Sequence, residues 1–304
     1  MPTVDTTPET LRPYKFHGLE LDDPKGGEAL AECPFCSKPG KFSVNVESGQ
    51  YRCWSCAEGT DKGGGNAVVF IRKLHELSLA ATTAADYEEL QHHRKLSYPE
   101  TLIDWAVCRS ITTGNWLVPG YGIDGKLNQL YQYIQYPDRM KLLPTPTLHH
   151  QLHGMNLWDA DKPGAIICEG PWDGMKLYEV MRRAKDVDGV FHMTASVKAS
   201  IYSQYNIISV PGCKTFFKHW LPLFAGREVR ICYDNDHPGK NEKTGTRITP
   251  AGYDGVRYVT ELLNTCEPLP TSISYLQWSG SYELDHAAAL PGGFDLRDAF
   301  AGGL

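Results

Sequence analysis

Four cysteines in two close pairs constrain this chain more than any other feature. Two Cys-x2-Cys pairs, separated by sixteen residues, place thiols at Cys33, Cys36, Cys53 and Cys56. Two residues between thiols let one turn present both sulfurs to an ion, and two such turns complete a tetrahedron. The segment between the pairs alternates apolar and polar residues around Ser48-Gly49, which predicts a β-hairpin. We therefore expect a zinc ribbon with a closed, structural site; an iron–sulfur cluster is the competing interpretation.

Aromatic and basic residues surround these cysteines, among them Tyr51, Trp54, Lys38, Lys41 and Arg52. In one interpretation the rings pack the small ribbon and the cations are solvated. In the other, Trp54 or Tyr51 stacks on a nucleobase while the cations meet phosphate. Trp54 is the candidate nucleic-acid contact of this segment.

The remaining composition excludes several classes of protein. The chain has 304 residues and nine cysteines, and the five outside the two pairs are scattered, which does not fit a disulfide framework and suits a reducing compartment. The formal net charge of -6 excludes a uniformly basic nucleic-acid coat, but not an enzyme whose carboxylates hold metal. The sequence shows no signal-peptide pattern and no run of 18 apolar residues, so we expect a cytoplasmic protein without a membrane span.

The chain divides into segments of different character. The polar composition of residues 1–30, rich in Pro, Thr and Gly, predicts an extended N-terminal lead-in. The glycine run Lys62-Gly63-Gly64-Gly65 predicts a flexible joint. Apolar residues between 68 and 77 have helical spacing, and the stretch 97–160 predicts a mixed α+β segment with strands near 116–119 and 130–136. We expect three domains: the ribbon with its lead-in at 1–62, the N-terminal part of a catalytic core at 63–160, and a catalytic domain at 161–304.

From residue 161 onward, buried strands alternate with helices. This alternation is typical of an α/β fold with a largely parallel sheet. The predicted strands are 165–168, 207–210, 229–233 and 272–278, and the predicted helices are 173–184 and 252–263.

Acidic residues follow these strands. Glu169 comes directly after the first strand, Asp234 and Asp236 follow the third, and Asp295 and Asp298 lie near the C-terminus. Ligands in open α/β sheets bind at the carboxyl ends of strands, so these carboxylates are expected to converge. Oxygen ligands without His or Cys suit Mg²⁺. Taken alone, an Asp-x-Asp after a strand is more often a turn or a helix cap.

The order of these motifs resembles a known family. ICEGPWDGMKLYEV, SVPGCKTF and CYDNDHPGK with AGYDGVRYV are similar to the three motifs of the Toprim domain, which bacterial primases share with topoisomerases and some nucleases. The ribbon followed by GGGNAVVFIRKLHELS, and the segment LPGGFDLRDAF, resemble parts of bacterial and phage DNA primases. The resemblance covers nearly the whole chain beyond residue 30. It departs from the family in a longer segment after Asp236 and in the Asp-x-x-Asp spacing of Asp295 and Asp298.

This resemblance implies a primase that synthesises short RNA primers on single-stranded DNA from ribonucleoside triphosphates, beside a separate helicase. Glu169, Asp234 and Asp236 would form the catalytic Mg²⁺ site, assisted by Asp295 or Asp298, and Mn²⁺ could also fill this site. Alternatively, Glu169 would act as a general base.

Arg139 and Lys141 resemble a basic stretch that contacts nucleic acid or nucleotide. Lys240, with Lys243 and Arg247, lies in the longer segment, which either grips phosphate or is a solvated loop. A short primase of this type suggests a phage or plasmid origin, and the compartment would then be the cytoplasm of the bacterial host.

Two rival functions remain open at this stage. A Toprim nuclease would use the same acids to cut nucleic acid, and a non-catalytic zinc-ribbon protein would only bind DNA. A topoisomerase would need a nucleophilic Tyr on a further domain. The histidines of TLHHQLHG, which are His149, His150 and His153, more often have surface or packing roles than metal-binding ones.

Overall fold

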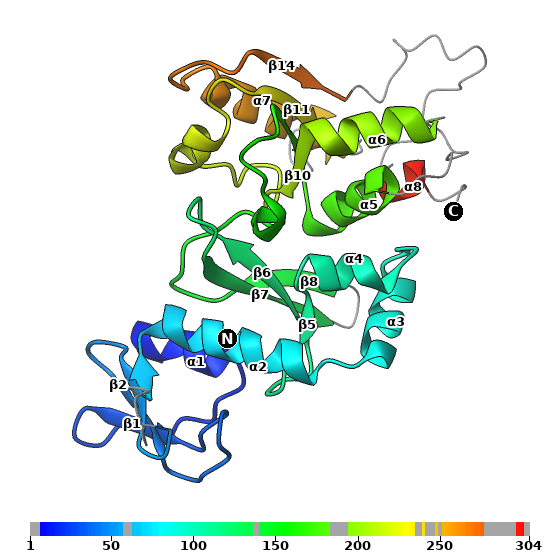
Figure 1. Cartoon of the computed structure of the whole chain (residues 1–304). Coiled ribbons are helices and arrows are strands. Elements are labelled where there is room, and N and C mark those ends of the chain that lie inside the picture. Colours follow the sequence, from blue (N-terminus) through cyan, green and yellow to red (C-terminus); the bar gives the residue numbers. More distant parts are fainter. Residues whose placement is uncertain are drawn as a thin grey trace. The chain divides into compact units, whose positions relative to one another are not determined.

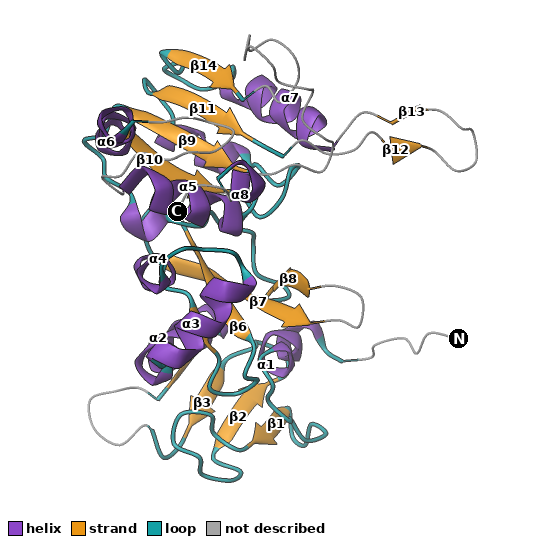
Figure 2. Cartoon of the chain, turned by 90° about the vertical axis from the view of Figure 1, so that its right-hand side faces the viewer, coloured by secondary structure: helices purple, strands orange, loops and turns teal. Residues whose placement is uncertain are grey.

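The computed structural model describes residues 7–56, 63–135, 140–182, 194–234, 239–240, 247–248, 251–276 and 296–300. It divides into two compact units (Figures 1 and 2). The first comprises Met1–Tyr87, Ala106–Gly122 and Lys126–Gln151; the second comprises Glu88–Trp105, Ile123–Gly125 and Leu152–Leu304. The expected mixture of a cysteine-bearing antiparallel ribbon and a parallel α/β sheet is confirmed. No described helix has the length and apolar character needed to span a membrane.

The first unit contains two antiparallel sheets. One has the order β1-β2-β3-β4, formed by Glu28–Ala31, Phe42–Asn45, Tyr51–Cys53 and Gly64–Gly65. The other has the order β5-β6-β7-β8, formed by Cys108–Arg109, Trp116–Tyr121, Leu127–Gln135 and Met140–Pro144. The expected hairpin between the cysteine pairs is confirmed as β2 and β3, with Gly49 at φ 67° in the turn. A positive φ of this kind favours glycine.

Helix α2 (Ala67–Ala81) lies where apolar spacing predicts a helix. Its N-cap Asn66 accepts the backbone N–H of Val69 at 3.1 Å, which satisfies one of the open donors of the first turn. Phe70 of α2 is fully buried, and its ring lies 4.9 Å from that of Tyr14 and 6.0 Å from that of Phe42, between ring centroids. Further along, α2 packs on β7. The helix therefore joins the ribbon to the second sheet of the same unit.

The structure corrects two expectations about the N-terminal part. The lead-in is not extended throughout, because it contains the short helices η1 (Glu9–Leu11) and α1 (Arg12–Phe16). The predicted flexible joint is also wrong at Gly64 and Gly65, which form strand β4 against β3. A Cβ on Gly64 would lie 2.4 Å from the carbonyl oxygen of Tyr51, so the close pairing depends on glycine. The ribbon is thus packed into its unit by hydrogen bonds and rings.

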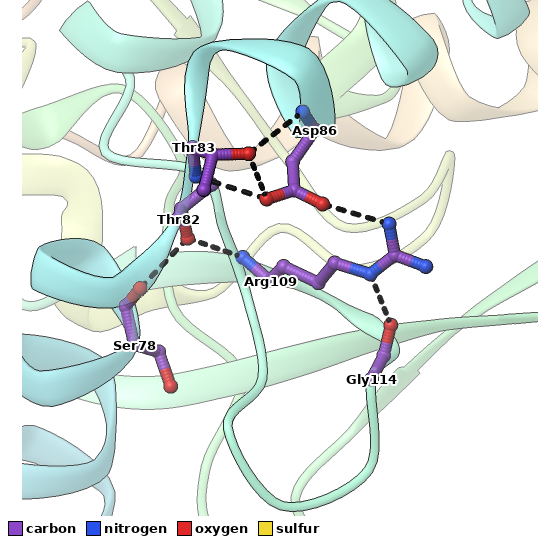
Figure 3. A network of polar contacts seen from close by, with 6 residues as sticks. All are labelled: Ser78, Thr82, Thr83, Asp86, Arg109 and Gly114. Atoms are coloured by element: carbon purple, nitrogen blue, oxygen red, sulfur yellow. Dashed lines mark hydrogen bonds and ion pairs between the residues drawn. The ribbon is translucent and has the colours of Figure 1, made fainter.

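A polar network ties the end of α2 to the edge strand β5 (Figure 3). Arg109 donates to Asp86 at 2.8 Å and, through Nε, to the carbonyl of Gly114 at 3.1 Å. Asp86 also accepts the backbone N–H of Thr83 at 2.9 Å, in the manner of a helix capping box at the start of α3 (Ala84–His93). Hydrogen bonds from Thr83, followed by the Arg109 guanidinium, lower the pKa of Asp86. This network has a structural role.

The second unit is built on a four-stranded parallel sheet of order β10-β9-β11-β14. Its strands are β9 (Gly164–Cys168), β10 (Tyr205–Ser209), β11 (Glu228–Cys232) and β14 (Ser272–Tyr275), within one to three residues of the predicted ranges. Strands β9 and β10 are buried along their whole length, as parallel strands covered by helices usually are. Helix α5 (Pro171–Arg182) packs against both of these strands, and α6 (Ala195–Gln204) packs against β10 and α5.

Shorter elements complete the second unit. They are α4 (Pro99–Asp104), η2 (Met155–Leu157), η3 (Lys218–Leu223), β12 (Gly239–Lys240), β13 (Arg247–Ile248), α7 (Ala251–Leu263) and α8 (Leu296–Ala299). The predicted helix at 252–263 is confirmed as α7, which turns its small and apolar residues inward. Helix α8 packs against α5.

Candidate functional site

The four predicted metal ligands come together in one cluster. Their sulfur atoms all lie within 4.8 Å of one another. The Sγ atoms of Cys33 and Cys56 are 3.8 Å apart, and those of Cys36 and Cys53 are 3.7 Å apart. Four sulfurs at about 2.3 Å from a zinc ion in a tetrahedron would be separated by about 3.8 Å. The cluster therefore has the dimensions of a closed four-thiolate metal site.

The chemistry of the cluster also fits a cation. The Sγ atom of Cys53 accepts the backbone N–H of Cys56 at 3.4 Å, a contact that stabilises a thiolate. Burial, followed by contacts with Cys53 and Cys36, raises the pKa of Cys56 to about 11. Four neighbouring sulfurs cannot all ionise near neutral pH without a shared positive charge.

The rings around the cluster have different environments. Tyr51 is 4% exposed and stacks on Phe42, so it belongs to the packing of the ribbon. Trp54 is 55% exposed, and the guanidinium of Arg52 lies 4.0 Å from its ring centroid. Of the two aromatic residues considered for base stacking, only Trp54 presents its ring to solvent.

The parallel sheet brings two of the predicted acids to one edge. Strands β9 and β11 are hydrogen-bonded neighbours, and Cys168 of β9 is the register partner of Cys232 of β11. Glu169 follows the first of these strands, and Asp234 follows the second by one further residue. The backbone N–H of Asp234 donates to Oε2 of Glu169 at 3.4 Å. The two residues thus lie side by side at the carboxyl edge of the sheet, as their positions after the strands predict.

A third acid lies beside this pair and was missed from the sequence. Asp173 is in the first turn of α5 and is only 4% exposed. Its Oδ2 atom would lie 3.4 Å from a Cβ on Gly170, the residue directly after Glu169. Burial, followed by the charges of Cys232, Asp173 and Asp234, raises the pKa of Cys168 well above its usual value. An acid in the first turn of a helix is commonplace, so the pattern Glu-Gly-Pro-Trp-Asp carried only a weak signal.

A stacked cation also lies near the start of α5. The guanidinium of Arg94 lies 4.6 Å from the ring centroid of Trp172, a buried residue two positions after Gly170. Stacking on an aromatic ring fixes the plane of a guanidinium. The sequence carried no sign of this contact, because 78 residues separate the two partners.

The other predicted site residues are placed only in part. Within the described ranges, the cysteine cluster is the sole group of three or more His, Cys, Asp or Glu ligand atoms close enough to share an ion. Arg139, Asp236 and Asp295 lie outside the described residues. Asp298 lies in α8 and Lys240 in β12, where Lys240 is the register partner of Arg247, but their side chains are outside the described set. Lys141 is half-buried on β8.

Two of the three histidines, His150 and His153, have packing environments, and His149 is exposed. The Nδ1 atom of His150 lies 3.2 Å from the hydroxyl of Tyr131, and the two rings are stacked. His153 is fully buried and forms a backbone bridge with Ser209. No metal-binding group within the described part of the chain includes them.

Comparisons with known proteins give the following likenesses. No protein-family model matches the chain, and a search among curated proteins finds no match. Among solved structures, the chain is similar to the zinc-binding and RNA polymerase domains of the Aquifex aeolicus primase, at 14% identity and a TM-score of 0.41 over 97% of this chain and 80% of that one. It is also similar to the primase fragment of the bacteriophage T7 primase-helicase, at 14% identity and a TM-score of 0.41 over 81% and 88%. The RNA polymerase domain of the Mycobacterium tuberculosis primase gives 12% identity and a TM-score of 0.47 over 76% and 77%.

Proposed function

We propose that this chain is a DNA primase, which joins ribonucleotides into short primers on a single-stranded DNA template. The observation that carries the proposal is the pairing of Glu169 and Asp234 at the carboxyl edge of adjacent parallel strands. Carboxylates gathered at such an edge suit a metal-assisted reaction of phosphate esters. The four-cysteine ribbon in the same chain and the order of the sequence motifs favour primer synthesis over the other reactions of Toprim-like sites.

The cysteine cluster would hold one Zn²⁺ with a structural role. Cys33, Cys36, Cys53 and Cys56 would supply all four ligands, so no position is left for a substrate. Bound zinc would supply the positive charge that lets the four thiols ionise together. The exposed ring of Trp54 would remain available to nucleic acid.

The acids would hold Mg²⁺, or alternatively Mn²⁺, through carboxylate oxygens. Glu169 and Asp234 would be two of the ligands, with Asp236, Asp295 and Asp298 as further expected ligands, and the buried Asp173 supports the position of the site. Bound metal would supply charge stabilisation for the incoming triphosphate. In the reaction, the primer 3′ oxygen forms a bond to the α-phosphorus, pyrophosphate leaves, and the proton of the 3′ hydroxyl passes to a base. Glu169 is the candidate for that base if it is not a metal ligand.

The nucleic-acid and nucleotide contacts belong to the same proposal. The candidate contacts are Trp54, Arg139, Lys141 and Lys240, and the guanidinium of Arg94, stacked on Trp172 in the first turn of α5, adds a described cation to this set. The partners would be the template strand, ribonucleoside triphosphates and a separate helicase. We retain the division of the chain at residues 62 and 160 as a proposal about functional parts.

The direct test is incubation of the full chain with single-stranded DNA, Mg²⁺ and labelled ribonucleoside triphosphates. We expect short labelled RNA that depends on the template and on Mg²⁺, and none from the Asp234→Ala variant. An Asp161→Ala variant removes an exposed acid before β9 and should remain active. Cleavage of the DNA without RNA synthesis would replace this proposal with a nuclease, and DNA binding without either reaction would leave a binding module.

A further inference from the structure

A cavity lies at the amino edge of the parallel sheet, within the second unit. Its volume is about 400 Å³, and its walls come from the loop between η2 and β9, from α5 and α6, and from the start of β10. The two helices pack on each other and on β10, which holds these walls in place (Figure 1). The lining residues that carry its chemistry are Trp158, Lys162, Tyr178, Tyr202 and Tyr205.

This cavity is distinct from the acidic site. Strand β10 begins at Tyr205, whose register partner on β9 is Gly164, and Lys162 precedes that glycine by two positions. Glu169 follows the opposite end of β9. A strand of five residues spans about 13 Å from its first Cα to its last. The proposed reaction at the carboxyl edge therefore makes no use of the cavity.

Four aromatic rings line the cavity. Tyr178 and Tyr205 are 7% and 4% exposed, whereas Trp158 and Tyr202 are half-buried. The hydroxyl of Tyr178 donates to Asp104 at 3.2 Å, and the hydroxyl of Tyr205 accepts from an arginine of β11 at 2.6 Å. Neither of these partners lines the cavity. The two buried tyrosines thus contribute ring surface to the cavity, which suits a flat aromatic group.

Lys162 brings a positive charge to this aromatic lining. Its Nζ donates to the carbonyl of Tyr202 at 2.7 Å and to that of Tyr205 at 3.4 Å. An ammonium has three donors, so one remains for a further acceptor. Among the described residues, no carboxylate oxygen lies within 4.0 Å of this Nζ. Burial, opposed by the charge of Asp159, lowers the pKa of Lys162, as expected for a cation that lacks a close counter-ion.

A second cation lies beside the same wall. The guanidinium of Arg227 lies 5.5 Å from the ring centroid of Trp158, and it donates to the carbonyls of Lys162 and, at 2.8 Å, of Ala160. Both acceptors are neutral, and no carboxylate in the described ranges lies within 4.0 Å of this guanidinium. Backbone oxygens therefore hold the two cations in place, while their charges stay available to an anion.

We infer that this cavity binds a mononucleotide, with the base against the rings and the phosphate on Lys162. Aromatic walls beside two cations without carboxylate partners match the two parts of a nucleotide, a flat ring and an anion. Two cations favour a phosphate group, whose charge near neutral pH is about −1.5 to −2, over a carboxylate. The volume lies in the range of small-molecule sites, which suits one nucleotide rather than a strand. The inference does not depend on the proposed function, because it uses none of the acids at the carboxyl edge.

The test measures ligand binding to the full chain without Mg²⁺. Each of the four ribonucleoside 5′-monophosphates is compared with its nucleoside by equilibrium dialysis. Omission of Mg²⁺ removes the ion through which carboxylates would hold a phosphate. At least one monophosphate should bind with a Kd below about 1 mM, and more tightly than its nucleoside.

Two kinds of substitution separate the ring from the charge. Lys162→Met should weaken monophosphate binding at least about 10-fold and nucleoside binding by less than about threefold, because it deletes a charge-assisted hydrogen bond to phosphate. Tyr202→Leu should weaken both ligands about 10-fold, because it deletes a stacking surface. Lys162→Arg keeps the charge and should retain the preference for the monophosphate. Denaturant unfolding of each variant identifies any loss of binding that comes from misfolding.

Matched controls address general charge effects and the acidic site. Lys214→Met removes a lysine that is 63% exposed on the turn after β10, and it should bind as the unchanged protein does. Asp234→Ala should also bind nucleotide unchanged. The inference is overturned if no monophosphate binds below about 1 mM, or if folded Tyr202→Leu binds it as tightly as the unchanged protein. It is also overturned if Asp234→Ala weakens binding and the cavity variants do not. A chain that binds nucleotide in this cavity but makes no primer contradicts only the proposed function.

Discussion

The backbone N–H of Asp234 donates a hydrogen bond to Oε2 of Glu169 at 3.4 Å, across two neighbouring parallel strands. This contact aligns two residues that are 65 positions apart, and its donor is the backbone N–H of Asp234, which a side-chain substitution keeps. Substitution of the Asp234 carboxylate is therefore expected to affect chemistry more than folding.

Asp234→Asn should lower primer synthesis by at least about 100-fold, because a metal ligand contributes several kcal/mol to the transition state. The free energy of unfolding should change by less than about 1 kcal/mol, since the substitution is isosteric and keeps the backbone N–H. Synthesis and denaturant unfolding are measured on the same preparation, beside Asp161→Asn. Activity within threefold of the unchanged protein would remove Asp234 from the metal site.

Cys53→Ser should abolish tight zinc binding, and it should destabilise the second sheet of the first unit as well as the ribbon. Phe70 contacts the rings of Tyr14 and Phe42 and lies on the helix that packs on β7, so loss of the ribbon removes part of the packing of the second sheet. Zinc content by elemental analysis and amide hydrogen exchange of residues 116–135 check both parts. Protection of β6 and β7 that is the same with and without zinc would show that the ribbon and the sheet are independent.

His17 should make the first unit sensitive to acid. Its Nδ1 accepts an N–H of Gln132 at 3.2 Å and its Nε2 lies 2.8 Å from the hydroxyl of Thr145, so the neutral ring with a proton on Nε2 satisfies both partners. Burial lowers its pKa from 6.5 to about 3. Between these two values the unfolded chain binds a proton that the folded chain does not, so stability falls as the pH drops from about 6.5 toward 3.

The measurement for His17 is urea unfolding at several pH values from about pH 7 to pH 4. His17→Gln should be less stable at neutral pH and should show a shallower dependence on pH, since the titrating group is gone. Equal dependence in the two proteins would mean that other groups dominate the acid response.

A buried ion pair should fix the segment before α4 to α5. Lys176 and Glu179 are 3% and 1% exposed and lie 2.8 Å apart, and Glu179 also accepts the backbone N–H of Ser97 at 2.9 Å and the hydroxyl of Thr101 at 3.2 Å. Lys176→Met leaves a buried carboxylate without its cation and should cost about 3–5 kcal/mol of unfolding free energy. Lys176→Met combined with Glu179→Gln removes both charges.

The double variant is expected to be more stable than Lys176→Met alone, because an amide at position 179 can still accept the hydrogen bond from Ser97 and carries no charge. Denaturant unfolding of the two variants and the unchanged protein makes the comparison. A double variant less stable than the single one would show that the carboxylate is needed for the backbone contact rather than for the pair.

The sequence by itself determined the features that local chain geometry controls. Two residues between thiols and a short hairpin bring four sulfurs together whatever the rest of the chain does, and the cluster is found as expected. Short apolar runs that alternate with helical segments predict the strands of a parallel sheet. An acid that follows such a run must lie at the carboxyl edge of that sheet. The positions of Cys33, Cys53, Glu169 and Asp234 were predictable for this reason.

Only the tertiary structure decided what depends on contacts between distant segments. The burial of Asp173, the stacking of Arg94 on Trp172 and the meeting of Lys214 with α7 join residues whose neighbourhoods in the sequence contain no trace of the partner. The conformation of the glycines at 64 and 65 was likewise not predictable from the sequence. A glycine run that permits a flexible joint equally permits the close approach of β4 to β3. Glycine widens the set of allowed conformations, and the packing of the ribbon against Phe70 selects one of them.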